Sequence, residues 1–131
     1  MIRDVDNGLR RLLARARGLQ DVRLTVGVHE DTGAKRHPSG GDVVGAASVI
    51  ELGTDQRAPV GWLRTTIDER RGTLARDLAD AGARVLRGEA PADAFGPVVT
   101  GLAKTMRSRI PVDTGTVRDA VEARVDGVRV G

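Results

Sequence analysis

Residues 117–131 read VRDAVEARVDGVRVG and hold the clearest structural signal in the chain. The pair Asp126-Gly127 stands between two runs in which apolar residues alternate with polar ones. An Asp-Gly pair in this setting favours a tight hairpin, because a type I′ turn needs a positive φ at both central residues. The sequence therefore predicts a C-terminal β-hairpin with one strand on each side of the pair.

A partner strand is expected near the N-terminus, in 21-DVRLTVGVHE-30. Val22, Leu24, Val26 and Val28 occupy every second position, which is typical of a strand with one buried face. This strand lies far from the hairpin in sequence, so the sheet has to form by non-local pairing.

Helical spacing of apolar residues predicts helices in the rest of the chain. Residues 5–19 form an arginine-rich amphipathic pattern, which we expect to pack on the core; a basic helix on a membrane or on DNA is the alternative. Two long helices are expected from Leu63 to Val85 and from Phe95 to Ile110.

The stretch 42–54 fits either a buried strand or a short helix. Asp42 as an N-cap and Gly53 as a C-terminal stop favour the helix. Residues 31–41, DTGAKRHPSGG, show no periodicity, and we expect them to form a mobile loop. The whole pattern predicts one α+β domain over residues 1–131. It has a small antiparallel sheet, made of the N-terminal strand and the C-terminal hairpin, packed against two long helices and shorter ones.

The composition argues against several functional classes. The chain has no cysteine, which removes disulfides, thiolate metal sites and cysteine nucleophiles. Trp62 and Phe95 are its aromatic residues, too few for a surface that stacks nucleic-acid bases. No apolar run approaches the ~20 residues of a membrane span, and the N-terminus lacks the apolar stretch of a signal peptide. We therefore expect a soluble protein with no membrane partner.

Enzyme signatures are also weak. His29-Glu30 begins like a helical HExxH zinc motif, but the fifth position is Gly33 instead of histidine. No phosphate loop or dinucleotide fingerprint is present, and Ser48 and the other serines have no nucleophile-elbow context. The sequence predicts that the protein is not an enzyme, with no catalytic residues, no metal and no cofactor.

Three short segments resemble, in the same order, the motifs of one protein family. They are 51-ELGT-54, 58-APVGWLR-64 and 111-PVDTGTVR-118. The family is that of the tail-completion proteins at the head–tail junction, or neck, of tailed phages, which is related to phage virion morphogenesis proteins. Leu52 stands where the family usually has an aromatic residue, Trp62 replaces phenylalanine and Val117 replaces leucine.

The resemblance implies a structural virion protein that is assembled in the cytoplasm of the bacterial host. Such proteins form homo-oligomeric rings, commonly of six subunits, that complete or terminate the tail. Its partners would be a head-side connector or stopper protein and the tail tube protein, close to DNA. The alternative is a small basic nucleic-acid-binding or regulatory domain, suggested by the sequence pI of about 10.5 and the arginines of the first helix.

Under this resemblance, the expected contacts with other subunits or partners are made by Lys35, Arg36, His37, Leu52, Thr54 and Trp62. Trp62 either packs on its own core or meets a neighbouring subunit, where tryptophan is often a hot spot. Loop 31–41 is either a disordered excursion or an arm that reaches a partner ring or DNA. Asp113, Thr114 and Gly115 are expected to form the turn that ends one long helix and leads into the hairpin.

Overall fold

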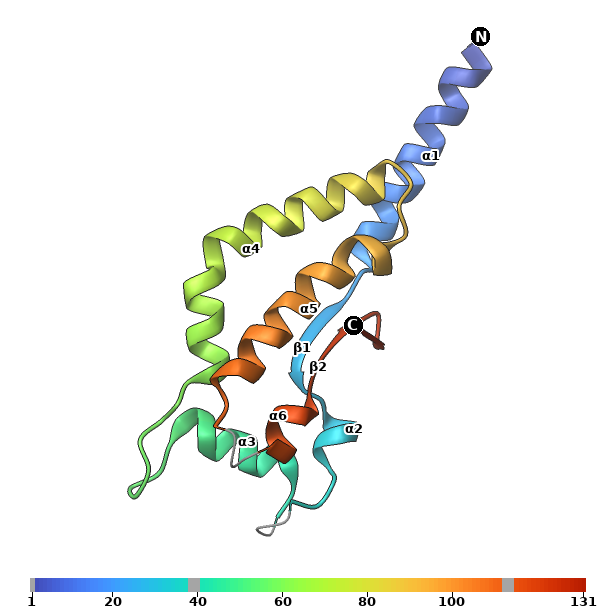
Figure 1. Ribbon diagram of the computed structural model, residues 1–131. Helices are drawn as coiled ribbons and strands as arrows, with labels where there is room; N and C mark the ends of the chain where they lie inside the picture. Colours follow the sequence, from blue (N-terminus) through green and yellow to red (C-terminus); the bar gives the residue numbers. More distant parts are fainter. Residues whose placement is uncertain (1, 38–40, 112–114) are drawn as a thin grey trace.

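The computed structural model of the protein describes residues 2–37, 41–111 and 115–131. Its elements are α1 (Ile2–Gln20), β1 (Leu24–Val28), α2 (Glu30–Gly33), α3 (Val43–Leu52), α4 (Trp62–Leu86), α5 (Pro91–Arg109), α6 (Gly115–Ala120), β2 (Val121–Val125) and β3 (Val128–Val130). Figure 1 shows how they are arranged. The fold is α+β, as the sequence predicts.

The sheet has three antiparallel strands in the order β1-β2-β3. β1 pairs with β2 from Leu24 opposite Val125 to Val28 opposite Val121. The β2–β3 turn has φ 52° at Asp126 and 80° at Gly127, which are the positive values that a type I′ turn requires. The predicted hairpin and its non-local partner strand are therefore confirmed.

One face of the sheet packs on α5, and α4 lies on the far side of α5 (Figure 1). Val121, Ala123 and Val125 of β2 are buried together with Val99 and Met106 of α5. Both long helices occur where the apolar spacing places them. Burial of a valine or methionine side chain contributes about 1.5–3 kcal/mol, so this layer holds the sheet in place.

Helix α1 differs from the prediction that it packs on the core. Every side chain from residue 8 to residue 18 is exposed, including Leu9 at 52%, Leu12 at 45% and Leu13 at 47%. Figure 1 shows the helix projecting from the body, and Leu19 near its end packs on the core. Because α5 already covers the apolar face of the sheet, α1 contacts α4 instead, where the Arg15 guanidinium donates to the Leu86 carbonyl at 3.1 Å.

The local sequence signals predict α3 correctly. Of the two alternatives for residues 42–54, a buried strand and a short helix, the structure contains the helix. The Asp42 carboxylate accepts a 2.7 Å hydrogen bond from the Gly45 N–H, as an N-cap does. Gly53 ends the helix with φ 75° and ψ 179°.

Two segments differ from the sequence prediction. Within the described residues 31–37 and 41, the predicted loop is not a loop throughout, because Glu30–Gly33 is a helical turn in which the Gly33 N–H donates to the His29 carbonyl at 2.6 Å. Residues 38–40 of the predicted loop lie outside the described residues. The chain does not enter the hairpin directly from residue 115, because Gly115–Ala120 forms helix α6, on which Val117 is fully buried. Gly115 is the first residue of α6, whereas Asp113 and Thr114 lie outside the described residues.

Candidate functional site

The second face of the sheet carries polar side chains. Thr25 lies opposite Arg124, and Gly27 lies opposite Glu122. The alternation of a strand directs these residues away from the valine layer that packs on α5. With residues of α2 they form a cluster of polar and charged groups that combines two strands and a helix.

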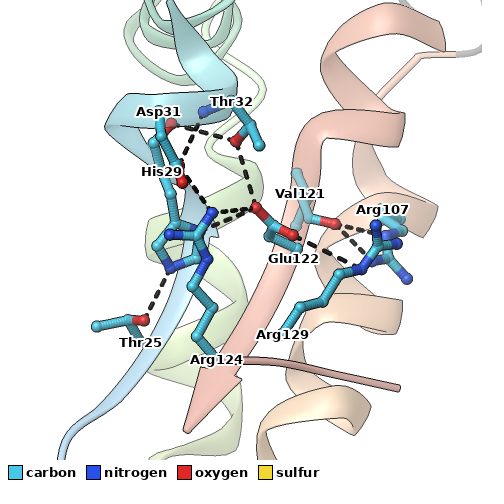
Figure 2. A network of polar contacts seen from close by, with 9 residues as sticks. All are labelled: Thr25, His29, Asp31, Thr32, Arg107, Val121, Glu122, Arg124 and Arg129. Carbon is cyan, nitrogen blue, oxygen red and sulfur yellow. Dashed lines mark hydrogen bonds and ion pairs between the residues drawn. The ribbon is translucent and has the colours of Figure 1, made fainter. Parts of the chain in front are cut away.

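Glu122 is the centre of this cluster, and it is 5% exposed. Its Oε1 accepts hydrogen bonds from Arg124 at 2.6 Å and from the Thr32 hydroxyl at 3.3 Å (Figure 2). Arg129 Nε lies 3.6 Å from Oε2, and Arg124 also donates to Asp31 at 2.7 Å. The buried carboxylate is therefore paired, which is the condition for keeping a charge out of water.

The pairing lowers the pKa of both carboxyl groups. Burial raises the pKa of Glu122, but the hydrogen bond and charge of Arg124, helped by His29 and Thr32, outweigh it and hold that pKa below its usual value. The hydrogen bond from Arg124 also lowers the pKa of Asp31. Both groups are therefore charged at neutral pH, and α2 is tied to β2 by this charge pairing.

His29 joins the cluster through Thr25. Its Nε2 lies 2.8 Å from the Thr25 hydroxyl, while its Nδ1 lies 3.8 Å from Glu122 Oε1. Gly27 lies between the two residues with φ 139°, a backbone conformation that favours glycine over residues with a side chain. Burial and the nearby Arg124 lower the pKa of His29, so the imidazole is neutral at neutral pH.

The order hydroxyl, imidazole, carboxylate resembles a hydrolase triad in outline. In such triads the carboxylate accepts a hydrogen bond from Nδ1 and so orients the imidazole. Here Nδ1 is buried without a hydrogen-bond partner in the described structure, and the nearest carboxylate oxygen is bonded to Arg124. We interpret the cluster as a polar junction between α2, β1 and β2.

A pocket of about 320 Å³ opens beside this junction. Lys35 and Arg129 line it together with Glu122 and Asp119, so charges of both signs face the space. Lys35 is thus the one predicted contact residue that reaches the polar junction. Arg36 is exposed, and its backbone forms an isolated antiparallel β-bridge with Asp42. His37 donates its backbone N–H to the Gly41 carbonyl.

Leu52 and Thr54 lie at the opposite end of α3 from Lys35, Arg36 and His37. The ten residues of α3 separate the two groups by about 15 Å. Leu52 is 70% exposed, and Thr54 is exposed in a turn closed by its backbone bonds with Arg57. The predicted contact residues therefore form two separate surfaces.

Trp62 belongs to the core. It is 4% exposed, and its indole N–H donates to the Ala47 carbonyl at 3.3 Å. This is the alternative in which tryptophan packs on its own domain. The small exposed part of Trp62 lines, together with Leu52, an apolar groove beside β1.

Glu51 is a residue whose role the sequence analysis missed. Its carboxylate accepts hydrogen bonds from the backbone N–H groups of Leu63 at 2.8 Å and Arg64 at 3.0 Å. Gly61 occupies the N-cap of α4 and has no side chain to fill that role. One sequence signal could have indicated this role: the long helix α4 begins without Ser, Thr, Asp or Asn at its N-cap, so its first N–H groups need another acceptor.

The hydrogen bonds of the Glu51 carboxylate join the segments 51–54 and 58–64 into one structural unit. The Val60 N–H also donates to the Ile50 carbonyl at 2.9 Å, and the Gly61 N–H donates to the Glu51 carbonyl at 3.2 Å. The third segment, 111–118, contributes the buried Val117 through α6, which packs against α3.

The groove has a volume of about 280 Å³ and runs along β1. Its walls are mostly apolar and come from three elements: Val26, Gly27 and Val28 of β1; Val44, Ala47, Ser48, Glu51 and Leu52 of α3; Trp62 and Leu63 of α4. An apolar hollow beside a strand edge is a common place for an extended chain to bind.

Comparisons with protein-family models, with curated proteins and with solved structures find no match to this chain. Within residues 2–37, 41–111 and 115–131, no helix is long and apolar enough to cross a bilayer. The same residues hold no group of three or more His, Cys, Asp or Glu side chains placed to bind a metal ion.

Proposed function

We propose that the protein is a structural subunit of the head–tail junction of a tailed phage. Copies form a ring, of six subunits by the family resemblance, that completes or terminates the tail and joins it to the head. The observation that carries the proposal is the ordered set of three segments, 51–54, 58–64 and 111–118. The hydrogen bond that the Glu51 carboxylate accepts from the Leu63 N–H joins the first two segments in the structure.

The exposed apolar side chains are consistent with a subunit that makes contacts on more than one side. Leu9, Leu12 and Leu13 are exposed on α1, while Leu52 and Val49 are exposed on α3 at the other end of the molecule (Figure 1). A ring subunit needs two different surfaces for its two neighbours. Further surfaces would meet a head-side connector and the tail tube within the virion.

The proposal is tested by deleting the gene from the phage that encodes the protein and imaging the particles by electron microscopy. We expect DNA-filled heads and tails that remain separate, with joining restored when the intact protein is supplied from a plasmid. Joined and infectious particles in the deletion strain would overturn the proposal.

A second candidate function is nucleic-acid binding through α1. From residue 8 to residue 20 this projecting helix carries Arg10, Arg11, Arg15 and Arg17 and no acidic residue. Arg15 also bonds the Leu86 carbonyl at 3.1 Å. Such a helix should bind duplex DNA with an affinity that falls steeply as salt rises.

The DNA-binding candidate is tested by retention on duplex DNA over a salt series, with the triple variant Arg10→Gln, Arg11→Gln, Arg17→Gln as comparison. Loss of retention in the variant and a steep salt dependence in the wild type would support it. Absence of retention at about 50 mM salt would remove it.

A further inference from the structure

Strand β1 has a free edge that faces the groove. The Asp126 N–H donates to the Arg23 carbonyl at 2.8 Å, which shows that the backbone groups of residue 23 point toward the hairpin. In an antiparallel ladder this direction alternates, so those of Leu24, Val26 and Val28 point away from β2. Within the described residues, no hydrogen bond joins these three outward residues to another element.

The middle of β1 has open space beside it. Gly27 lines the groove, and a Cβ built on it, which would project on the polar face, meets nothing within 4 Å. A glycine inside a strand often marks a place where another chain comes close. Across the groove, Val44, Leu52 and Leu63 are 38%, 70% and 37% exposed. The groove is therefore suited to an extended segment that turns apolar side chains toward α3.

The other edge of the sheet, β3, has the matching pattern. Val125 pairs with Val128 and Ala123 with Val130, so both β3 valines lie on the apolar face of the sheet. Arg129, opposite Arg124, lies on the polar face. Because residues 128 and 130 direct their backbone toward β2, the N–H and carbonyl of Arg129 point outward.

Val128 is 68% exposed although it belongs to the apolar face. If β3 lay parallel to the outer edge of β1 of a second copy and continued the sheet, Val128 would lie on the apolar face and enter the groove beside Leu52 and Leu63. Arg129 would then lie on the polar face, next to Thr25 and Gly27. The same pairing would satisfy outward backbone groups on both edges, which contact with a helix could not do.

We propose that β3 of one copy pairs with the outer edge of β1 of the next copy and places Val128 in the groove between β1 and α3. The contact joins two different surfaces of the same chain, so it repeats head to tail and closes into a ring where the rotation between copies permits. The inference rests on the proposed function for its place in a ring, but the contact can be measured on the purified protein.

The absence of cysteine in the chain allows a direct cross-linking test. Ser48→Cys places a thiol on the groove wall, and Val128→Cys places one on β3. The double variant, treated with a short bis-maleimide over a concentration series, should give a ladder of covalent oligomers. The matched control is Val49→Cys with Val128→Cys, because Val49 is exposed on α3 but does not line the groove. We call Ser48→Cys with Val128→Cys the groove pair. No covalent ladder from the groove pair, or equal ladders from the groove pair and the control pair, would overturn the contact.

Two further variants, each added to the groove pair, test the chemistry of the contact. Leu52→Glu should weaken association about tenfold or more, because the contact would bury an unpaired carboxylate, whereas Val49→Glu should not change it. Arg129→Pro removes an outward N–H and also the guanidinium near Glu122, so it is compared with Arg129→Gln, which keeps the N–H. Only the proline variant should reduce cross-linking, while thermal unfolding, followed by circular dichroism, shows an intact fold in both. Cross-linking that persists in Leu52→Glu and Arg129→Pro would contradict the proposal.

The two proposals fail separately. If the groove pair gives no ladder but deletion particles still have separate heads and tails, the neck role stands and the β1–β3 contact is wrong. If the ladder forms but deletion leaves particles joined, the contact stands and the neck role is wrong.

Discussion

The carboxylate of Glu51, in the last turn of α3, accepts a 2.8 Å hydrogen bond from the backbone N–H of Leu63 in the first turn of α4. The free N–H groups at a helix start attract negative charge, and the positive end of the helix dipole adds to this attraction. Glu51 thus supplies from twelve positions away the cap that Gly61 cannot provide.

Replacing Glu51 with alanine should lower the free energy of unfolding by about 1–2 kcal/mol, because two backbone donors lose a charged acceptor. Glu51→Gln should lose less, since its amide oxygen can still accept one bond. Urea denaturation followed by circular dichroism measures both. Asp55→Ala changes an exposed carboxylate in the following turn and serves as the control. Equal stability of Glu51→Ala and wild type would show that the cap contributes nothing.

Gly53→Ala should destabilise the protein by about 2 kcal/mol or more. Its φ of 75° with ψ 179° lies in a region that is essentially restricted to glycine. A Cβ there would lie 2.7 Å from the Arg57 carbonyl oxygen and from the Pro59 nitrogen. Gly101→Ala is the matched control, because that glycine lies inside α5 with open space around it and should gain about 0.5–1 kcal/mol. The difference in melting temperature between the two variants checks the prediction.

Trp62→Ala should cost about 3–5 kcal/mol, as expected for removing a large buried side chain. Leu12→Ala on the projecting helix α1 should change stability by no more than about 0.5 kcal/mol, because Leu12 is 45% exposed. Both values follow from denaturant titrations. A loss in Leu12→Ala as large as that in Trp62→Ala would mean that α1 packs against the body in solution.

Acid should weaken the polar junction through Glu122. The pKa of this carboxyl is below its usual value of 4.5, so the unfolded chain takes up the proton first as the pH falls. The stabilisation is therefore complete above pH 4.5 and is lost as the pH falls through the folded-state pKa. Asp31 has a lowered pKa and acts in the same direction.

Urea midpoints measured from about pH 6 down to about pH 3 test this prediction. The wild type should lose stability more steeply in acid than Glu122→Gln, which has no carboxylate to protonate. Asp55→Asn, a change at an exposed carboxylate that does not line the pocket beside the polar junction, should keep the slope of the wild type. Parallel profiles for the wild type and Glu122→Gln would refute a stabilising charge at position 122.

The apolar residues of α1 show that a local sequence pattern can predict a helix without predicting which surface it packs on. The spacing of Leu9, Leu12 and Leu13 predicts a helix, and a helix forms, but the same spacing cannot say whether an apolar surface is free to receive it. In this fold α5 covers the apolar face of the sheet, and α1 contacts α4 instead. Residues 115–120 illustrate a related limit, because this segment of six residues before β2 is helical and buries Val117, although its sequence pattern did not predict a helix.

The sequence by itself determined the hairpin at Asp126-Gly127, the partner strand, the start of α3 at Asp42 and the two long helices. These features depend on φ preferences, side-chain alternation and capping, which act over a few neighbouring residues. Only the tertiary structure decided that Glu51 caps α4, that Glu122 meets Thr32 and Arg124, and that β1 keeps a free edge beside an apolar groove. Those relations depend on which surfaces remain uncovered once the core has formed, and the partners lie up to 90 residues apart in the chain.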